Sequence, residues 1–227
     1  MKYKAIIFDM DGTIIYSEHL WYAANLELLN NRNIVLSQEK KKQLEKEIFG
    51  RTAKDSCLIL KEIAQLNDEI ESLTCELRTL ERLHEVVLVD GFLAFHARAQ
   101  KHNLKMAIAT NASPSTVEQI NNALKLNSFF AHHIYNVSHV AQGKPNPDIY
   151  LHAAAQLGIA PEECIAIEDS QHGLRAARDA GMFCIGINTS KQPERLALAD
   201  LIINHYDEID LEKLLKASIF AQDTERF

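Results

Sequence analysis

Four short polar signatures contain the residue types that could carry out chemistry. They are Asp9-Met10-Asp11-Gly12-Thr13, Thr110-Asn111-Ala112-Ser113, Lys144-Pro145-Asn146-Pro147-Asp148 and Glu168-Asp169-Ser170. Each signature alone has an ordinary structural explanation, because Asp, Asn and Ser commonly form turns or cap helices after a strand. Together they supply carboxylates, a hydroxyl group and one ammonium group, and this combination favours a functional site.

The acidic residues of these signatures need compensation by positive charge. Four carboxylates would converge at the carboxyl edge of a parallel sheet, those of Asp9, Asp11, Glu168 and Asp169. Two unit charges ~4 Å apart repel by ~4 kcal/mol at an effective dielectric constant near 20. Mg²⁺ relieves such repulsion, since it takes oxygen ligands, keeps several waters and uses few carboxylates. Lys144 supplies a further positive charge, and one of the acids could also hold a proton.

The elements that must position these signatures are short strands alternating with helices. Short continuous apolar runs suit parallel strands that are buried on both faces. The expected strands span residues 4–8, 105–109, 164–167, 183–187 and 200–203, with a weaker run at 133–137. In a parallel sheet the functional edge lies at the carboxyl ends of the strands, where three of the four signatures begin.

The helices between these strands carry recognisable end signals. Ser113-Pro114 predicts an N-cap followed by proline at the first helical position, although Ser115-x-x-Glu118 could form a capping box instead. Asn146-Pro147 opens another helix, and Gly158 and Gly181 stand where helices should end. Strands alternating with helices imply right-handed βαβ crossovers, so we expect an α/β fold with a Rossmann-like three-layer parallel-sheet core.

Residues 17–86 interrupt this alternation with helical patterns only. Ser17 and Ser37 start two helices, the second ending at Gly50, Thr52-x-x-Asp55 caps a third, and a fourth pattern covers 68–84. A helical insert of about seventy residues predicts a separate module, reached through mobile hinges near 14–17 and 86–91. We therefore expect a core of residues 1–15 and 87–227 and a helical domain of residues 16–86.

Composition and charge exclude several classes of protein. The chain of 227 residues is 47% hydrophobic and 24% charged, which is typical of a soluble globular protein. Its formal net charge of −7 argues against a nucleic-acid partner, because an acidic surface repels phosphate backbones. The four cysteines form no C-x-x-C pair and are expected to be reduced thiols.

The sequence also lacks the patterns of export and membrane insertion. Met1 leads directly into the apolar run at 4–8, without the apolar region and cleavage site of a signal peptide. No apolar run approaches the ~18–20 residues that span a bilayer. We therefore expect a cytoplasmic protein, a monomer or weak homodimer, with no membrane or nucleic-acid partner.

The signature Asp9-Met10-Asp11-Gly12-Thr13 resembles the D-x-D-G-T motif of the haloacid dehalogenase (HAD) hydrolases. Thr110, Lys144 and the Glu168-Asp169 pair resemble the remaining three motifs of that superfamily in order and spacing. The resemblance covers nearly the whole chain. The insert at 16–86 resembles the α-helical cap domain of the subgroup that contains phosphoglycolate phosphatases, sugar-phosphate phosphatases and β-phosphoglucomutases.

This resemblance implies a role for each acidic residue. Asp9 would attack phosphorus and form an aspartyl-phosphate, which splits one difficult step into two easier ones. Asp11 would protonate the leaving oxygen and then take a proton from the attacking water. Mg²⁺ would be bound by Asp9, Asp169 and the backbone carbonyl of Asp11, with Glu168 as a direct or water-mediated ligand.

The resemblance also implies residues that contact the substrate. The candidates are Thr110, Lys144, Asn111, Ser113, Trp21 and Arg51. Thr110, Lys144 and backbone N–H groups around Asp11 and Asn111 would hold the phosphoryl oxygens, as phosphoryl transfer requires mainly positioning and charge neutralisation. In the cap, Trp21 could line the pocket or belong to the core, and Arg51 could reach a substrate anion or simply face solvent.

Other positions separate the members of the superfamily. Asp11 favours phosphoryl over carbon–halogen chemistry, because the haloacid dehalogenases have no acid at this position. The β-phosphoglucomutases, as we align them, have a His where this chain has Trp21 and an Arg where it has Ala53. The stretch Phe49-Gly50-Arg51-Thr52 instead resembles the phosphatase branch. Tyr16 departs from the family pattern, in which relatives often carry Asp at this hinge position.

Taken together, the residues and the resemblance predict a Mg²⁺-dependent phosphatase that hydrolyses a small phosphomonoester through an aspartyl-phosphate. The substrate class would be a sugar phosphate or a phosphoglycolate-like metabolite. A β-phosphoglucomutase-like mutase is the first alternative, and it would require a bisphosphate activator. A non-enzymatic phospho-aspartyl regulatory protein is the second, and it would bind Mg²⁺ without turning over any metabolite.

Overall fold

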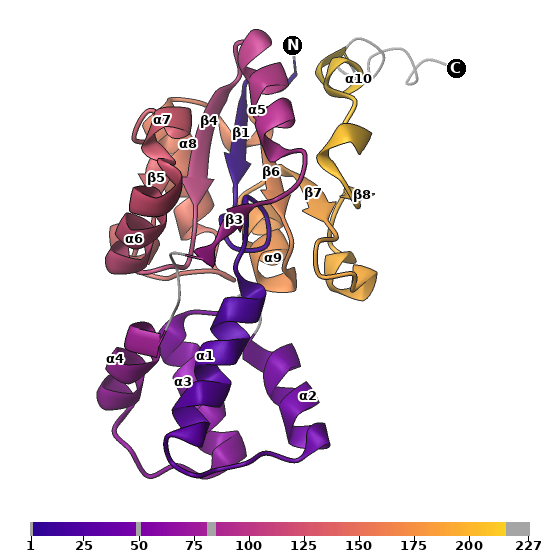
Figure 1. Cartoon of the computed structure of the whole chain (residues 1–227). Helices are drawn as coiled ribbons and strands as arrows, with labels where there is room; N and C mark the ends of the chain where they lie inside the picture. The colour runs from indigo at the N-terminus through magenta and orange to yellow at the C-terminus, as the bar shows by residue number, and fades with distance from the viewer. Residues whose placement is uncertain (1, 49–50, 81–84, 217–227) are drawn as a thin grey trace.

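A six-stranded parallel sheet forms the centre of the protein (Figure 1). The computed structural model describes residues 2–48, 51–80 and 85–216. The strands are β1 (Ala5–Phe8), β4 (Lys105–Ala109), β5 (Ile134–Tyr135), β6 (Cys164–Glu168), β7 (Phe183–Ile187) and β8 (Leu201–Ile203), in the order β5-β4-β1-β6-β7-β8. All five neighbouring pairs are parallel, which confirms the predicted α/β fold class.

Helices cover both faces of this sheet, as βαβ crossovers require. The core helices are α5 (Phe92–Lys101), α6 (Pro114–Leu124), α7 (Asn127–Phe130), α8 (Asp148–Leu157), α9 (Gln171–Asp179) and α10 (Leu211–Lys216). Short 3₁₀ helices are η2 (Val137–His139), η3 (Pro161–Glu163), η4 (Pro193–Leu196) and η5 (Tyr206–Glu208). One buried cluster includes side chains from α5, α6, α7 and α10, and another includes side chains from α8 and α9.

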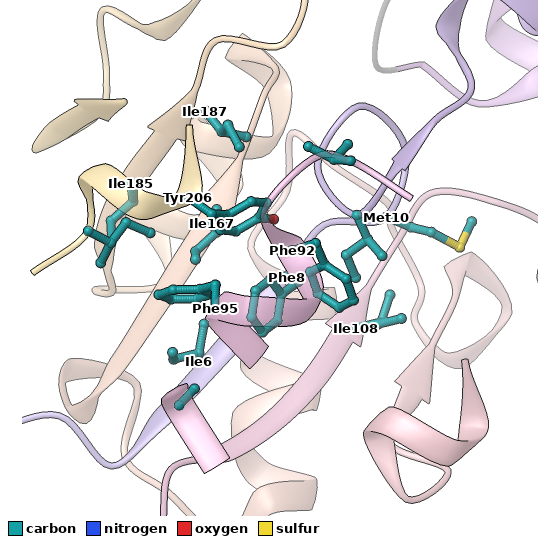
Figure 2. Packing of buried hydrophobic residues seen from close by; sticks show 14 of the residues in the cluster. Ile6, Phe8, Met10, Phe92, Phe95, Ile108, Ile167, Ile185, Ile187 and Tyr206 are labelled. Atoms are coloured by element: carbon teal, nitrogen blue, oxygen red, sulfur yellow. The ribbon is translucent and has the colours of Figure 1, made fainter. Parts of the chain in front are cut away.

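The strands alternate between these two clusters. In β1, Ile6 and Phe8 pack in the first cluster, whereas Ala5 and Ile7 pack in the second. Phe8 meets the ring of Phe92 edge-on, with centroids 5.8 Å apart (Figure 2). Burial on both faces explains why the strands appear in the sequence as continuous apolar runs.

The helix-end signals act mostly as expected. The Ser113 side chain accepts a hydrogen bond from the backbone N–H of Thr116, so Ser113-Pro114, rather than Ser115, caps α6. Helix α8 begins directly after Pro147 and ends at Gly158, which has a left-handed φ of 66°. Strand β5 is shorter than the predicted run at 133–137, because the Asn136 side chain accepts from the Ser138 N–H and starts η2.

The described part of the insert contains four helices with their own buried cluster. They are α1 (Glu18–Asn30), α2 (Gln38–Ile48), α3 (Ala53–Ala64) and α4 (Ile70–Leu80). Thr52 caps α3 by accepting from the Asp55 N–H, as predicted. The expected end of the second helix at Gly50 lies outside the described residues, as do residues 81–84 of the fourth pattern. The helices lie at the carboxyl ends of the core strands, where a lid would cover a site (Figure 1).

The two chain segments that join the insert to the core pair with each other. Strand β2 (Ile15–Tyr16) runs antiparallel to β3 (Val87–Leu88), and Tyr16 lies opposite Val87. The sequence predicts hinges at 14–17 and 86–91 but no strands there. We propose that residues 16–86 are the cap domain and that residues 1–15 and 87–227 are the core. We also propose that the pairing of β2 with β3 makes the two hinges bend together. Within the described residues, no helix has both the length and the apolar character needed to cross a membrane.

Candidate active site

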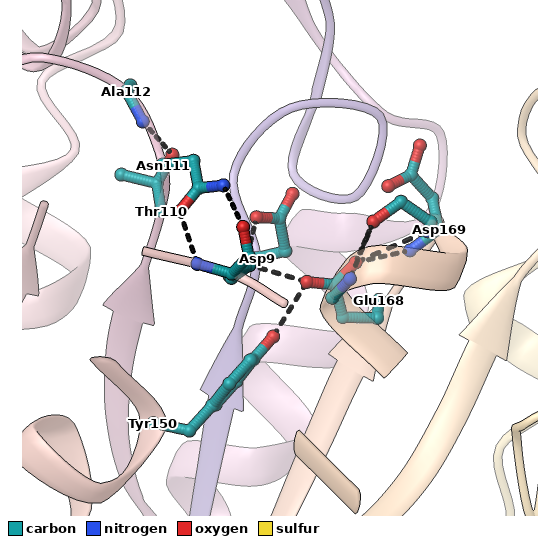
Figure 3. Close-up of polar contacts among 10 residues, drawn as sticks. Asp9, Thr110, Asn111, Ala112, Tyr150, Glu168 and Asp169 are labelled. Carbon is teal, nitrogen blue, oxygen red and sulfur yellow. Dashed lines mark hydrogen bonds and ion pairs between the residues drawn. The ribbon is translucent and has the colours of Figure 1, made fainter. Parts of the chain in front are cut away.

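The ends of three central strands bring the polar signatures together. Phe8, the last residue of β1, pairs in register with both β4 and β6, so the three strands end at nearly the same level. Asp9, Thr110 and the Glu168-Asp169 pair therefore emerge at one edge of the sheet, and all of them are buried (Figure 3). The tertiary structure thus produces the convergence that the motif order predicts.

The loop after β1 is held in a sharp turn. Gly12 has a φ of 71°, a left-handed conformation that favours glycine. The Thr189 hydroxyl donates to the backbone carbonyl of Gly12 at 2.7 Å, and the Tyr206 hydroxyl donates to that of Thr13 at 2.9 Å. These bonds to distant segments fix the backbone that carries Asp9 and Asp11.

Asn111 fixes the loop that carries Lys144. Its side-chain oxygen accepts from the backbone N–H of Lys144 at 2.9 Å, and its amide group donates to the Lys144 carbonyl at 3.1 Å. Asn111, predicted to contact phosphate or substrate, thus uses its side chain to position the lysine. Its backbone N–H remains the proposed phosphate contact.

The Lys144 ammonium group lies between two buried carboxylates. Its Nζ is 2.5 Å from Oδ1 of Asp9 and 2.6 Å from Oε1 of Glu168, and only 2% of the Lys144 side chain is exposed. Burial lowers the pKa of Lys144, but the ion pairs with Asp9 and Glu168 outweigh this effect and hold the pKa above its ordinary value. Lys144 therefore carries its positive charge throughout the neutral range.

Asp9, Glu168 and Asp169 form a group that can accommodate a cation. One carboxylate oxygen from each lies within 4.8 Å of the others. Burial, followed by the charge of Glu168, raises the pKa of Asp9 well above its ordinary value, despite the opposing effect of Lys144. A divalent ion here would oppose this shift in the pKa of Asp9, so this oxygen-rich site fits an ion such as Mg²⁺.

The Asp11 carboxylate is not part of this group, and the prediction for Asp11 at the ion concerns its backbone carbonyl. Its Oδ1 accepts from the Ser17 hydroxyl at 2.5 Å and from the Trp21 indole N–H at 3.0 Å. Burial raises the pKa of Asp11, while these two bonds act to lower it. The sequence predicts only a helix start at Ser17. In the structure, Ser17 also binds the carboxylate of Asp11, the predicted acid–base residue, from the hinge.

Replacing Trp21 with phenylalanine should lower kcat by up to about tenfold, because the Asp11 carboxylate loses one of its two donors. The aromatic ring remains, so KM should change less than kcat. Steady-state kinetics would measure both constants, with Tyr22→Phe as the matched control in the same cavity. Equal kinetics for the Trp21 variant and the control would show that the indole N–H has no part in positioning Asp11.

A cavity of about 540 Å³ lies between the helical insert and the core. Its lining includes every predicted site residue except Glu168, namely Asp9, Asp11, Trp21, Arg51, Thr110, Asn111, Ser113, Lys144 and Asp169. Glu168 is fully buried beneath this surface. Four cationic side chains border the cavity in addition to Lys144: Arg51, Lys54, Arg78 and Arg195.

The remaining predicted residues differ in whether their side chains are already used in hydrogen bonds within the protein. The Thr110 hydroxyl accepts from the N–H of Ala112 at 3.0 Å and can still donate to an anion. Ser113 caps α6 with its side chain, so a structural role accounts for this residue. Arg51 is exposed, and its Nε donates to the backbone carbonyl of Glu47 at 2.8 Å.

The chain is similar to known proteins over most of its length. The sequence model of the haloacid dehalogenase-like hydrolase family matches residues 3–181. The β-phosphoglucomutase of Bacillus subtilis (strain 168) is 29% identical over 218 residues, which cover 93% of each chain. Hexitol phosphatase A of Escherichia coli (strain K12) is 25% identical, over 98% of this chain and 100% of its own. The crystal structure of CbbY from Rhodobacter sphaeroides in complex with phosphate superposes with a TM-score of 0.77 at 26% identity, over 92% of this chain and 96% of that one.

The chain therefore belongs to the haloacid dehalogenase-like hydrolases. The predicted membership of this family is confirmed, and so is the prediction that the protein is an enzyme.

Proposed function

We propose that the protein is a cytoplasmic Mg²⁺-dependent phosphatase that hydrolyses a small phosphorylated metabolite, as a monomer or weak homodimer. The position of Lys144 between Asp9 and Glu168, at the base of a cavity with cationic walls, carries this proposal. A phosphoryl group needs a nucleophile and fixed positive charge at the same point. The named relatives include a hexitol phosphatase and a β-phosphoglucomutase, which supports this substrate class.

The proposed chemistry has two steps. In the first, an Oδ atom of Asp9 attacks phosphorus, and Asp11 gives its proton to the leaving oxygen. In the second, Asp11 removes a proton from water, which attacks phosphorus and frees Asp9 and inorganic phosphate. Asp11 faces the cavity from the hinge, where Ser17 and Trp21 hold it. The helical insert, as a lid, would exclude bulk water during the first step.

Positive charge must be present for both steps. Asp9, Asp169 and the Asp11 backbone carbonyl would hold Mg²⁺, which neutralises charge on the phosphoryl oxygens when bound. Lys144 and the Thr110 hydroxyl would bind those oxygens from the other signatures. Arg51 and Arg195, which line the same cavity, favour a substrate in which the part outside the phosphoryl group is polar or anionic.

A panel of phosphomonoesters tests this function. We expect release of inorganic phosphate from at least one sugar phosphate or small phosphorylated acid, and loss of release when EDTA removes the metal. The mutase alternative, favoured by the similarity to β-phosphoglucomutase, predicts isomerisation of a sugar phosphate that depends on a bisphosphate activator. Isomer formation without net phosphate release would replace the phosphatase assignment with the mutase assignment. Magnesium binding without turnover of any metabolite would instead indicate a regulatory protein.

Magnesium should stabilise the folded protein independently of any substrate. Ligand at ~100 times its dissociation constant adds about 2.7 kcal/mol, which corresponds to a rise in Tm of about 5–10 °C at this chain length. The physical reason is relief of repulsion among Asp9, Glu168 and Asp169. Scanning calorimetry with MgCl₂, against NaCl at equal ionic strength, measures the effect. Asp169→Asn should remove most of the shift, and an undiminished shift in this variant would place the ion elsewhere.

A further inference from the structure

The Glu168 carboxylate is surrounded by hydrogen-bond donors on both oxygens. Its Oε1 accepts from Lys144 Nζ at 2.6 Å and from the Tyr150 hydroxyl at 2.8 Å. Its Oε2 accepts from the Asp169 N–H at 3.1 Å, the Ser170 N–H at 3.2 Å and the Ser170 hydroxyl at 3.1 Å. A carboxylate offers about four lone-pair sites, so these donors leave little capacity for direct coordination of an ion.

The backbone of α9 provides the space that Glu168 occupies. A Cβ atom added to Gly173 would lie 1.7 Å from Oε1 and 1.9 Å from the carboxyl carbon of Glu168. The Ser170 hydroxyl, which donates to Glu168, also accepts from the Gly173 N–H at 3.0 Å. The first turn of this helix therefore fits the carboxylate closely in one position.

Tyr150 of α8 also contacts the Glu168 carboxylate. Its side chain is fully buried, and its ring lies 4.9 Å from Lys144 Nζ, within range of a cation–π contact. Burial, followed by the charges of Glu168 and Asp9, raises the pKa of Tyr150 well above its ordinary value. Its hydroxyl group thus keeps its proton and donates to Glu168.

We propose that Tyr150 is a positioning residue, which acts through Glu168 to hold the Lys144 ammonium group against Asp9. A lysine side chain has four rotatable bonds and little directional preference of its own. Here the Tyr150 hydroxyl orients the Glu168 oxygen that binds Nζ, and the Tyr150 ring limits the other side of Nζ. Glu168 accordingly serves as the anchor of Lys144 and contacts an ion only through water. This inference rests on the proposed phosphatase function for its kinetic consequence.

Replacing Tyr150 with phenylalanine tests the proposal, because it removes only the hydroxyl group and keeps the buried ring. With p-nitrophenyl phosphate and saturating Mg²⁺, kcat should fall by about tenfold, the effect of losing one hydrogen bond to a charged group. The half-saturating Mg²⁺ concentration should stay within about twofold of the parent value, since the anchor is not a direct ligand. Titration calorimetry with inorganic phosphate, in the presence of Mg²⁺, should show weaker binding because Lys144 holds the phosphoryl oxygens less firmly.

Two further variants separate positioning from general packing. Tyr135→Phe is the matched control, since it also removes a tyrosine hydroxyl, here bonded to His133 at 2.8 Å, and it should leave kcat and phosphate affinity unchanged. Gly173→Ala displaces the Glu168 carboxylate by a steric clash and keeps the Tyr150 hydroxyl, so it should lower kcat and phosphate affinity as Tyr150→Phe does. Thermal unfolding of each variant verifies that the protein remains folded.

Two results would overturn the proposal. Parent-like kcat and phosphate affinity in folded Tyr150→Phe would reduce the tyrosine to a packing role. A kcat deficit that excess Mg²⁺ repairs would show that Glu168 and Tyr150 support the ion rather than Lys144. If the parent itself hydrolyses no phosphomonoester, the proposed function fails. The titrations still test the positioning of Lys144 in that case, because they compare the phosphate affinity of the parent with that of the variants.

Discussion

Replacing Asp9 with asparagine should lower kcat by at least about 10⁴-fold, because the amide cannot act as the nucleophile that forms the aspartyl-phosphate. Asp9 lies 2.5 Å from Lys144 Nζ, belongs to the acidic group suited to a cation and, unlike Glu168, lines the cavity. Two of the neighbouring carboxylates are engaged elsewhere. Glu168 is buried beneath the cavity, and Asp11 is turned toward Ser17 and Trp21.

The same substitution should leave the fold intact. Burial and the charge of Glu168 raise the pKa of Asp9, so the ionised group disfavours the folded state at neutral pH when no metal is bound. Removing the charge should hold the Tm of the metal-free variant at or above that of the parent. Kinetics and scanning calorimetry together measure this, with the exposed Asp179→Asn as control. Turnover within about tenfold of the parent would assign the nucleophile to another residue.

Replacing Lys144 with methionine should lower kcat by about 10³-fold and the free energy of unfolding by about 3–5 kcal/mol. Methionine keeps most of the volume of lysine but leaves Asp9 and Glu168 buried without their shared cation. The kinetic effect has a separate cause, since the phosphoryl oxygens lose a fixed positive charge in the transition state.

Lys105→Met is the matched control for this variant. The Lys105 ammonium group also donates to an oxygen, the backbone carbonyl of Leu157, at 2.6 Å. Lys105 lies at the start of β4, however, at the opposite end of the strand from the cavity-lining signatures. Urea unfolding should show only a small loss for this control. If Mg²⁺ at saturation restored full kcat to Lys144→Met, the lysine would serve only to balance charge in the absence of the ion.

The strands that consist of buried apolar runs could be predicted from the sequence, whereas the two short strands β2 and β3 could not. Strands β4 and β7 end where expected, because a polar residue stops each apolar run, Thr110 after β4 and Asn188 after β7. The ribbon of Ile15–Tyr16 with Val87–Leu88 was not expected, since strands of two residues are too short to show a period. Their pairing depends on the insert bringing residues more than seventy positions apart together, which local patterns do not encode.

In the candidate site, too, some features could be predicted from the sequence and others could not. The motif order placed Asp9, Thr110, Lys144 and Asp169 correctly around one cavity, because parallel strands put their carboxyl ends at one edge. The orientation of the Asp11 carboxylate could not be predicted, since it depends on donors from the hinge and α1. Tyr150 gave no signal because it lies in an apolar stretch of α8 and looks like an ordinary core aromatic.

Reductive trapping of the covalent intermediate tests the central claim most directly. Sodium borohydride reduces an acyl phosphate to an alcohol, so an aspartyl-phosphate at position 9 becomes homoserine. With p-nitrophenyl phosphate, whose leaving group departs without a proton from Asp11, the Asp11→Asn variant should accumulate this intermediate, because it lacks the base that activates water. After mixing with a turned-over phosphomonoester and Mg²⁺, peptide mass spectrometry should find homoserine at position 9 and unmodified aspartate without substrate. Unmodified Asp9 in the substrate-treated sample, or phosphate on a different side chain, would contradict the account.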